Sequence, residues 1–127
     1  MSREIVRTDK APAAVGPYSQ AVRAGGWLFV SGQIPIDPQT GEVVSGGVEE
    51  QARQVLKNIQ AVLDAAGLGL GHVVKVTVFL TDMDSFQRVN EVYASFFASD
   101  PPARACVEVS RLPKGVDVEM EAVAHEG

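Results

Sequence analysis

Arg104 is the side chain whose neighbours best suit the binding of a small anion. It stands between Ala103 and Ala105, and these small residues leave room for a ligand beside the guanidinium. A guanidinium can hold a carboxylate through two parallel hydrogen bonds. Carboxylates follow at alternate positions further along the chain, at Asp117, Glu119 and Glu121. Such groups on neighbouring strands can face solvent, pair with one another, or form a polar pocket under a partner, and the spacing leaves all three open.

Two predicted strands carry these groups. Residues 103–109 alternate apolar and polar side chains, which is typical of a strand with one apolar face. Residues 116–124 do the same, and their apolar side comprises Val116, Val118, Met120, Ala122 and Ala124. Between the strands, Pro113 cannot donate to a ladder and Gly115 has no side chain, so residues 110–115 are predicted to form a turn.

Two further stretches have the apolar spacing of amphipathic helices. The first covers residues 48–66, and Gly67 can adopt the left-handed conformation that ends a helix. The second begins after a cap at Asp82 or Asp84. Its apolar face comprises Phe86, Val89, Val92, Tyr93, Phe96 and Phe97. Asn90, at the edge of that face, can either face water or reach into a site.

The remaining strands are predicted at residues 3–7, 19–24, 27–31 and 73–80. Gly25-Gly26 tolerates the positive φ values of a tight hairpin turn between the second and third of these. The even-numbered residues from Val74 to Leu80 form one apolar face. Residues 27–30 are apolar on both faces, which predicts burial on both.

This order of elements predicts one domain, residues 1–127, of the α+β class with both helices packed on one side of a single sheet. The other face of the sheet is expected to need water or a second subunit, and the apolar residues mixed into it favour a subunit. The residues expected on that face include Lys75, Arg104, Cys106 and Glu119.

Composition limits the function classes. The chain has 127 residues, of which 46% are hydrophobic and 21% charged, as in ordinary folded proteins. A net charge of −5 and no cluster of Lys and Arg argue against a nucleic-acid partner, because that binding depends on neutralising phosphates. No membrane span and no signal peptide are evident, and Cys106 is the only cysteine, so a cytoplasmic protein is predicted. His72 and His125 are isolated, which argues against a zinc site.

Several motifs, in order along nearly the whole chain, resemble those of the Rid family, also called the YjgF or liver perchloric-acid-soluble protein family. The most specific stretches are residues 102–109, Arg111-Leu112-Pro113 and residues 118–121. The supporting stretches are residues 14–20, 31–35, 40–42, 65–67 and 89–93. One departure is the short connection at residues 98–101, which leaves one cleft wall undefined.

This resemblance implies a chorismate-mutase-like fold with a mixed six-stranded sheet, assembled as a homotrimer with clefts between subunits. It implies an enamine or imine deaminase, which hydrolyses 2-iminobutanoate and 2-iminopropanoate to 2-keto acids and ammonia. The family's substrate-binding arginine, acidic residue and tyrosine correspond to Arg104, Glu119 and Tyr18. The expected partner is thus a small imino or keto acid.

The residue types suit this chemistry. Arg104 can bind the substrate carboxylate, while Glu119 orients or deprotonates a water and then returns a proton to the departing ammonia. No metal or organic cofactor is required, because a protonated imine is already electrophilic. The full predicted substrate-binding set is Arg104, Tyr18, Ser31, Gly32, Asn90 and Cys106, and the predicted catalytic pair is Glu119 and Arg104.

Other interpretations of the same residues stay open. Glu119 can be only an ion-pair partner of Arg104 or Lys75, and Tyr18 only a loop anchor. Cys106 can be a nucleophile, although packing with a backbone role is favoured because no His stands nearby in sequence. Glu108 is predicted to be structural.

Other functions are also open. The same pocket can belong to a module that binds a small carboxylate without turnover. The label of ribonuclease or translation inhibitor attaches to the family, but acidic charge and the lack of a His pair for acid-base cleavage argue against it. A chaperone role would leave no mark in the sequence.

Overall fold

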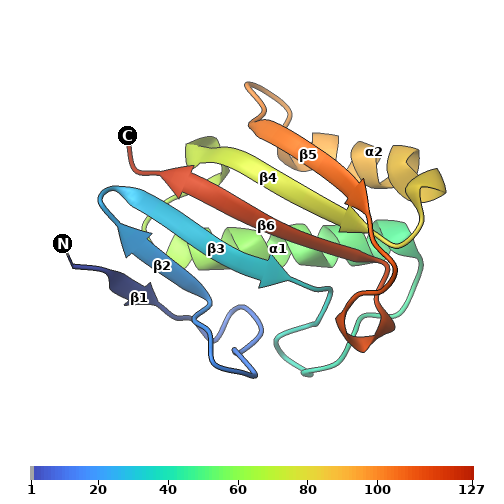
Figure 1. The fold of residues 1–127 in the computed structure, drawn as a ribbon, viewed down its shortest axis with the longest axis horizontal. Helices are drawn as coiled ribbons and strands as arrows, with labels where there is room; N and C mark the ends of the chain where they lie inside the picture. Colours follow the sequence, from blue (N-terminus) through green and yellow to red (C-terminus); the bar gives the residue numbers. More distant parts are fainter. Residues whose placement is uncertain (1) are drawn as a thin grey trace.

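The structure is a computed structural model that describes residues 2–127, so Met1 of the predicted domain lies outside the described residues. Six strands form one sheet in the order β1-β2-β3-β6-β4-β5 (Figure 1). Within this sheet β4 and β5 are parallel, and the other neighbouring pairs are antiparallel. The elements in chain order are β1 (Glu4–Val6), β2 (Ala21–Ala24), β3 (Trp27–Gln33), α1 (Val48–Ala65), β4 (Val73–Leu80), α2 (Phe86–Phe96), β5 (Ala103–Glu108) and β6 (Val118–His125). The predicted α+β class and mixed six-stranded sheet are confirmed.

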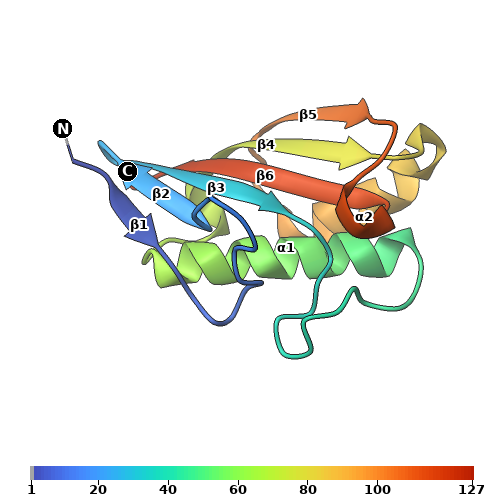
Figure 2. The same cartoon turned by 60° about the horizontal axis from the view of Figure 1, so that its bottom comes forward.

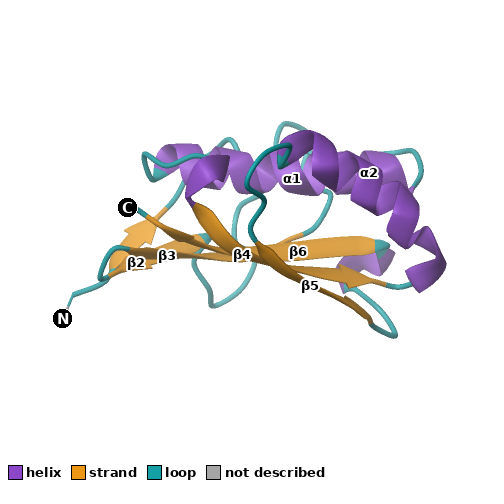
Figure 3. Ribbon diagram, turned by 90° about the horizontal axis from the view of Figure 1, so that it is seen from above, coloured by secondary structure: helices purple, strands orange, loops and turns teal. Residues whose placement is uncertain are grey.

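Both helices lie on one face of the sheet, as predicted (Figures 2 and 3). Among residues 2–127, no helix or strand covers the opposite face, and we call it the open face. The trimer and the chorismate-mutase-like fold stay predictions.

The core lies between the sheet and the helices. On β6 the side chains of Val118, Met120, Ala122 and Ala124 are buried, which confirms the predicted apolar side of that strand. Helix α1 packs its own stripe against them, comprising Val48, Ala52, Val55, Leu56, Ile59, Val62 and Leu63. Burying a side chain of this size stabilises a fold by about 1.5 to 3 kcal/mol, so these two stripes hold the layers together.

The predicted helix ends and hairpin turn are also present. Gly67 follows α1 with φ +76°, and Gly25 and Gly26 join β2 to β3 with φ +55° and +84°. These left-handed values are ones that glycine adopts without steric cost. The Asp82 side chain accepts a hydrogen bond from the Asp84 N–H, at 2.9 Å, and so caps the short turn η2 (Met83–Ser85) that leads into α2.

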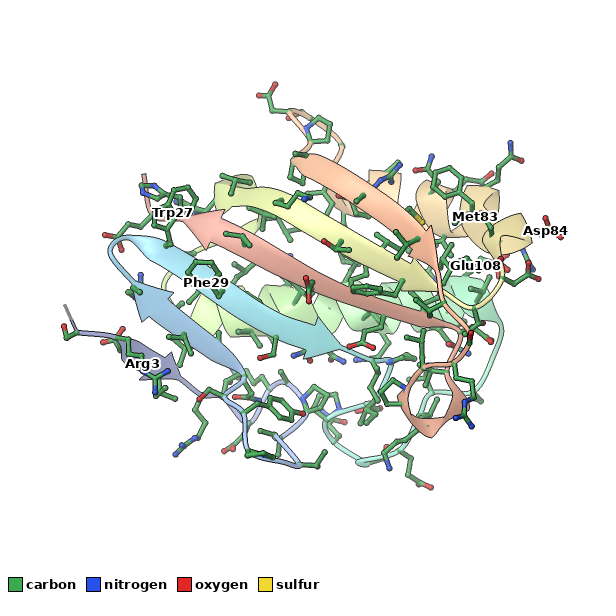
Figure 4. The ribbon with its side chains drawn as sticks, viewed as in Figure 1. Arg3, Trp27, Phe29, Met83, Asp84 and Glu108 are labelled. Atoms are coloured by element: carbon green, nitrogen blue, oxygen red, sulfur yellow. The ribbon has the colours of Figure 1, made fainter. Side chains whose placement is uncertain are left out.

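Two burial predictions are wrong, the first because the sheet is covered on only one side and the second because the pairing of β4 is irregular. Trp27 and Phe29 project from β3 (Figure 4), and their exposed fractions are 43% and 49% rather than near zero. Val74 is also exposed, because the pairing of β4 with β6 shifts between Val73 and Lys75. That irregularity turns Val73 inward and Val74 outward.

The prediction that Arg104 and Cys106 lie on the face of the sheet away from the helices is wrong. In the parallel register, Arg104 pairs with Val76 and Cys106 with Val78, and both valines are buried under the helices. Paired residues of neighbouring strands point to the same side, so Arg104 and Cys106 lie on the helix side of the sheet. The apolar side chains of β5 face the open side instead, and they belong to Ala103, Ala105 and Val107.

Within residues 2–127, neither helix combines the length and apolar character that crossing a bilayer requires.

Candidate active site

Arg104 extends from the edge strand β5 onto helix α2. Its Nη1 donates a hydrogen bond to Asn90 Oδ1 at 2.8 Å. Its Cζ lies 4.7 Å from the centroid of the Tyr93 ring and 5.3 Å from that of the Phe86 ring. The side chain is nonetheless exposed, because β5 is the edge strand and no further strand of the described residues lies beyond it. A guanidinium has five N–H donors, so an edge is left for a carboxylate.

A pocket of about 570 Å³ opens beside this guanidinium, lined by Met83, Asp84, Phe86, Gln87, Arg104 and Cys106. Met83, Asp84 and Glu108 lie together where β5 ends beside the start of α2 (Figure 4). Glu108 Oε1 accepts a hydrogen bond from the Met83 N–H at 2.8 Å, which fixes the turn at the pocket rim. This contact agrees with the predicted structural role of Glu108.

Cys106 lies in the same pocket and packs partly against the core. Burial raises the pKa of its thiol, and the Arg104 charge opposes this shift only in part. The thiol therefore stays protonated at neutral pH, and a protonated thiol is a poor nucleophile. This geometry favours packing over nucleophilic catalysis.

A second pocket, of about 520 Å³, contains most of the other predicted site residues. Tyr18, Ser31, Gly32 and Glu119 line it, together with an apolar wall that includes Val15, Ile34 and Ile36. Tyr18 is half exposed at the rim. The Ser31 hydroxyl donates to the Ser19 carbonyl at 2.6 Å, so it is already used to fix the loop that carries Tyr18.

Glu119 points to the open face and lies against Gly32. A Cβ built on Gly32 would lie 2.1 Å from Glu119 Oε2, so any side chain at this position would force the carboxyl group to move. Burial, followed by the charge of Glu121, raises the pKa of Glu119. Among residues 2–127 it forms no ion pair, with Arg104, Lys75 or any other cation.

The two pockets are separate within one chain. Arg104 lies on the helix side of β5, and Glu119 lies on the open side of β6, with β4 between the two strands. The predicted site residues thus fall into two groups, which we call half-sites. One comprises Arg104, Asn90 and Cys106, and the other comprises Tyr18, Ser31, Gly32 and Glu119. The hypothesis that Glu119 pairs with Arg104 is wrong within the chain.

The family model described as Endoribonuclease L-PSP matches residues 8–126. The chain belongs to this family, which is also called Rid.

A RutC family protein of Pyrococcus horikoshii is 56% identical over 124 residues, which cover 98% of each chain. A mouse protein named 2-iminobutanoate/2-iminopropanoate deaminase is 50% identical over 125 residues, which cover 98% of this chain and 93% of the mouse protein. Two solved structures, the YjgF gene product of E. coli and E. coli TdcF with bound serine, each give a TM-score of 0.94 at 48% identity. Both alignments cover 98% of this chain and 99% of the other.

Residues outside the predicted set build the second pocket. Gln20 is 4% exposed, and its side chain accepts from the Thr8 N–H and donates to the carbonyl groups of Thr8, Ala11 and Pro12. Gln20 thus holds together the proline-rich loop before Tyr18. The sequence signal was available, because a loop that cannot form a ladder needs side chains to satisfy its backbone groups.

Asn58 has a similar role on α1. It is 1% exposed, and its Nδ2 donates to the carbonyl groups of Ile34 and Ile36, at 3.1 and 3.0 Å. These bonds fix the wall of the second pocket to the helix. An amide on the buried face of an apolar helix was the signal that sequence reasoning missed.

Among residues 2–127, no group of three or more His, Cys, Asp or Glu side chains is arranged to hold a metal ion.

Proposed function

We propose that this protein is an imine deaminase that hydrolyses 2-iminobutanoate and 2-iminopropanoate to 2-keto acids and ammonia, and so removes reactive imines. The observation that carries the proposal is Arg104, an exposed guanidinium held by Asn90 with donors left for a carboxylate. The name of the mouse relative supports the same substrates. A charge-assisted pair of this kind contributes about 1.5 to 3 kcal/mol, enough to select 2-imino acids over uncharged imines.

We further propose that the active site forms between two copies of the chain in a homotrimer. The Arg104 pocket of one copy would meet the Glu119 pocket of the next. Two features support this arrangement: the half-sites lie on opposite faces, and part of the open face is apolar. Four apolar residues occupy paired positions on neighbouring strands of that face, namely Ile5, Val22, Phe29 and Val123.

The proposed reaction is addition of water followed by loss of ammonia. Arg104 binds the carboxylate, and the oxygen of a water attacks the carbon of the protonated C=N group. Glu119 accepts a proton from the water and passes it to the nitrogen. The C–N bond then breaks as the C=O bond forms, and Glu119 takes the remaining hydroxyl proton and delivers it to the departing ammonia. The products are a 2-keto acid and an ammonium ion. The raised pKa of Glu119 suits a group that must accept a proton and give it up again.

The other predicted residues would complete the cleft. Backbone groups at Gly32 and Cys106 would bind the substrate nitrogen or the water, and Tyr18 would close the cleft. The chemistry needs no cofactor, because protonation already makes the imine carbon electrophilic.

In the test, a threonine dehydratase generates 2-iminobutanoate in situ. The release of 2-ketobutanoate is then followed in competition with semicarbazide, which traps the imine. Wild type is expected to reduce the amount of trapped imine, and Arg104→Ala is expected to keep its fold and lose this effect. Equal trapping with wild type and without enzyme would contradict the deaminase. Unfolding of Arg104→Ala would show that Arg104 is structural.

A second candidate is a module that binds a small carboxylate without turnover. TdcF with bound serine favours it, because a ligand with an α-carboxylate occupies a protein of this fold. Binding of 2-ketobutanoate by wild type, together with no effect in the trapping assay, would favour this candidate.

A further inference from the structure

Helix α2 presents three side chains to Arg104 from one face. Phe86, Asn90 and Tyr93 follow the spacing i, i+4 and i+7, which places them in a row along a helix. The guanidinium lies over the rings at the two ends of this row and donates to the amide oxygen in the middle. We call these three residues the α2 cradle.

An exposed arginine is poorly prepared to bind a ligand without such support. It has several rotatable bonds, and fixing them costs about 2 kcal/mol of side-chain entropy. Cation–π contact with two rings holds the guanidinium against α2, and the bond to Asn90 sets its rotation. The cradle therefore restricts the guanidinium before a carboxylate arrives, which lowers the cost of binding.

We propose that Tyr93 and Phe86 are positioning residues, and that Asn90 acts through Arg104 rather than on the substrate. The cradle holds the guanidinium so that its free edge faces the 570 Å³ pocket and meets the carboxylate of a 2-imino or 2-keto acid. This inference rests on the proposed function, which supplies the identity of the ligand. It assigns the specificity for a carboxylate to helix α2 as well as to strand β5.

The ring of Tyr93 carries this role, and its hydroxyl does not. Tyr93 is 5% exposed, and its hydroxyl has no hydrogen-bond partner among the described residues. A buried hydroxyl without a partner destabilises a fold, so the hydroxyl is not present to stabilise the chain. Burial raises the pKa of Tyr93 despite the Arg104 charge, so the ring under the guanidinium is a neutral phenol.

The chain offers a matched control for the loss of an aromatic ring. Phe97 packs on Tyr93 with ring centroids 4.8 Å apart and is 8% exposed, but it does not lie under Arg104. Phe97→Leu therefore perturbs the same cluster as Tyr93→Leu without removing a cradle ring. Tyr93→Phe is the conservative variant, and Phe86→Leu replaces Tyr93→Leu if that variant does not fold.

The first measurement follows the Arg104 Nε–H signal by NMR and identifies it by its loss in Arg104→Lys. We expect a signal shifted by ring currents in wild type, Tyr93→Phe and Phe97→Leu, and a clearly smaller shift in Tyr93→Leu, where only the Phe86 ring remains. An unshifted wild-type signal would overturn the cradle. This readout does not depend on catalysis, so it tests the cradle even if the deaminase proposal fails.

The second measurement separates binding from turnover. In Tyr93→Leu, we expect the Kd for 2-ketobutanoate and the KM for 2-iminobutanoate to rise about five- to tenfold, with a smaller change in kcat. Tyr93→Phe should restore most of the affinity, and Phe97→Leu should keep wild-type KM. An equal rise in KM for Phe97→Leu, or no rise for Tyr93→Leu, would overturn the proposal.

A double-mutant cycle with Arg104→Lys makes the test specific, because an ammonium cannot stack its plane on the rings. Adding Tyr93→Leu to Arg104→Lys should weaken 2-ketobutanoate binding no further. Additive losses would mean that Tyr93 acts independently of Arg104, and would overturn its role as a positioning residue. If wild type binds 2-ketobutanoate but shows no turnover, the deaminase proposal fails while the cradle stands. If wild type does not bind 2-ketobutanoate, the carboxylate role of the cradle fails.

Discussion

Arg104 and Glu119 point to opposite faces of the same sheet, on strands β5 and β6 that are separated by β4. Two strand spacings amount to about 10 Å, and the sheet itself stands between the two side chains. A small substrate cannot contact both residues of one chain. If both act on one substrate, each active site must combine two chains.

This geometry predicts complementation between two inactive variants. Arg104→Ala and Glu119→Gln should each lose at least about 100-fold in turnover as pure proteins, because each removes one member of every site. If the protein is a trimer as proposed, and the two variants are unfolded together and refolded, about one site in four should combine an intact Arg104 with an intact Glu119. We therefore expect about a quarter of wild-type activity, measured by the semicarbazide competition assay.

The control mixes the two variants after they have folded separately, before subunits can exchange. That mixture should stay inactive. Failure of the refolded mixture to regain activity, with trimers confirmed by light scattering, would mean that the two residues do not share a site across chains.

Gly32→Ala should disable the site by moving Glu119. The added methyl group would lie 2.1 Å from Glu119 Oε2, so the carboxyl group must rotate away. We expect turnover to fall about as far as in Glu119→Gln, by about 100-fold or more, while the fold is kept. Steady-state kinetics with 2-iminobutanoate and circular dichroism would measure the two effects.

Gly71→Ala is the matched control, because nothing lies within 4 Å of a Cβ at that position. It should keep wild-type turnover. Normal turnover in Gly32→Ala would show that the position of the Glu119 carboxyl group is not critical.

Patterns within a few neighbouring residues predicted much of the fold. The spacing of apolar residues located α1, and Gly25-Gly26 located the hairpin, because both features are set by local backbone geometry. The face of Arg104 could not be predicted in this way. Alternation along β5 defines two faces, but only the parallel pairing with β4 decides which one meets the helices.

The site was predicted less completely than the fold. Tyr18, Ser31, Gly32 and Glu119 were singled out and do share a pocket. The role of Tyr93 was missed, because an aromatic residue in an apolar helical stripe looks like any other core residue. Its contact with Arg104 depends on how α2 docks beside β5, which no local pattern specifies.

Glu119→Gln should stabilise the fold at neutral pH. Burial and then Glu121 raise the pKa of Glu119 in the folded chain. The folded state thus binds this proton more tightly than the unfolded state does, and the resulting stability is present below the unfolded pKa and is lost as pH rises through the folded pKa. We expect Glu119→Gln to unfold at higher urea concentration than wild type at pH 7, with the gain shrinking as the pH falls through the folded pKa of Glu119.

The exposed Glu42 provides the control, since Glu42→Gln removes the same charge from a surface turn without relieving burial. It should leave the urea midpoint nearly unchanged. A lower midpoint for Glu119→Gln than for wild type at pH 7 would mean that the carboxylate stabilises the fold through a partner.

Gln20→Ala should loosen the loop that carries Tyr18. The buried amide forms hydrogen bonds with four backbone groups of Thr8, Ala11 and Pro12, and its loss leaves these buried and partly buried groups without this partner. We expect the free energy of unfolding to fall by about 1 to 3 kcal/mol and KM to rise, because Tyr18 would no longer be held at the pocket rim. Urea titration and steady-state kinetics would measure these changes, with Gln39→Ala on an exposed turn as the control. Hydrogen exchange in residues 8–18 should increase in Gln20→Ala alone, and unchanged exchange there would show that other contacts hold the loop.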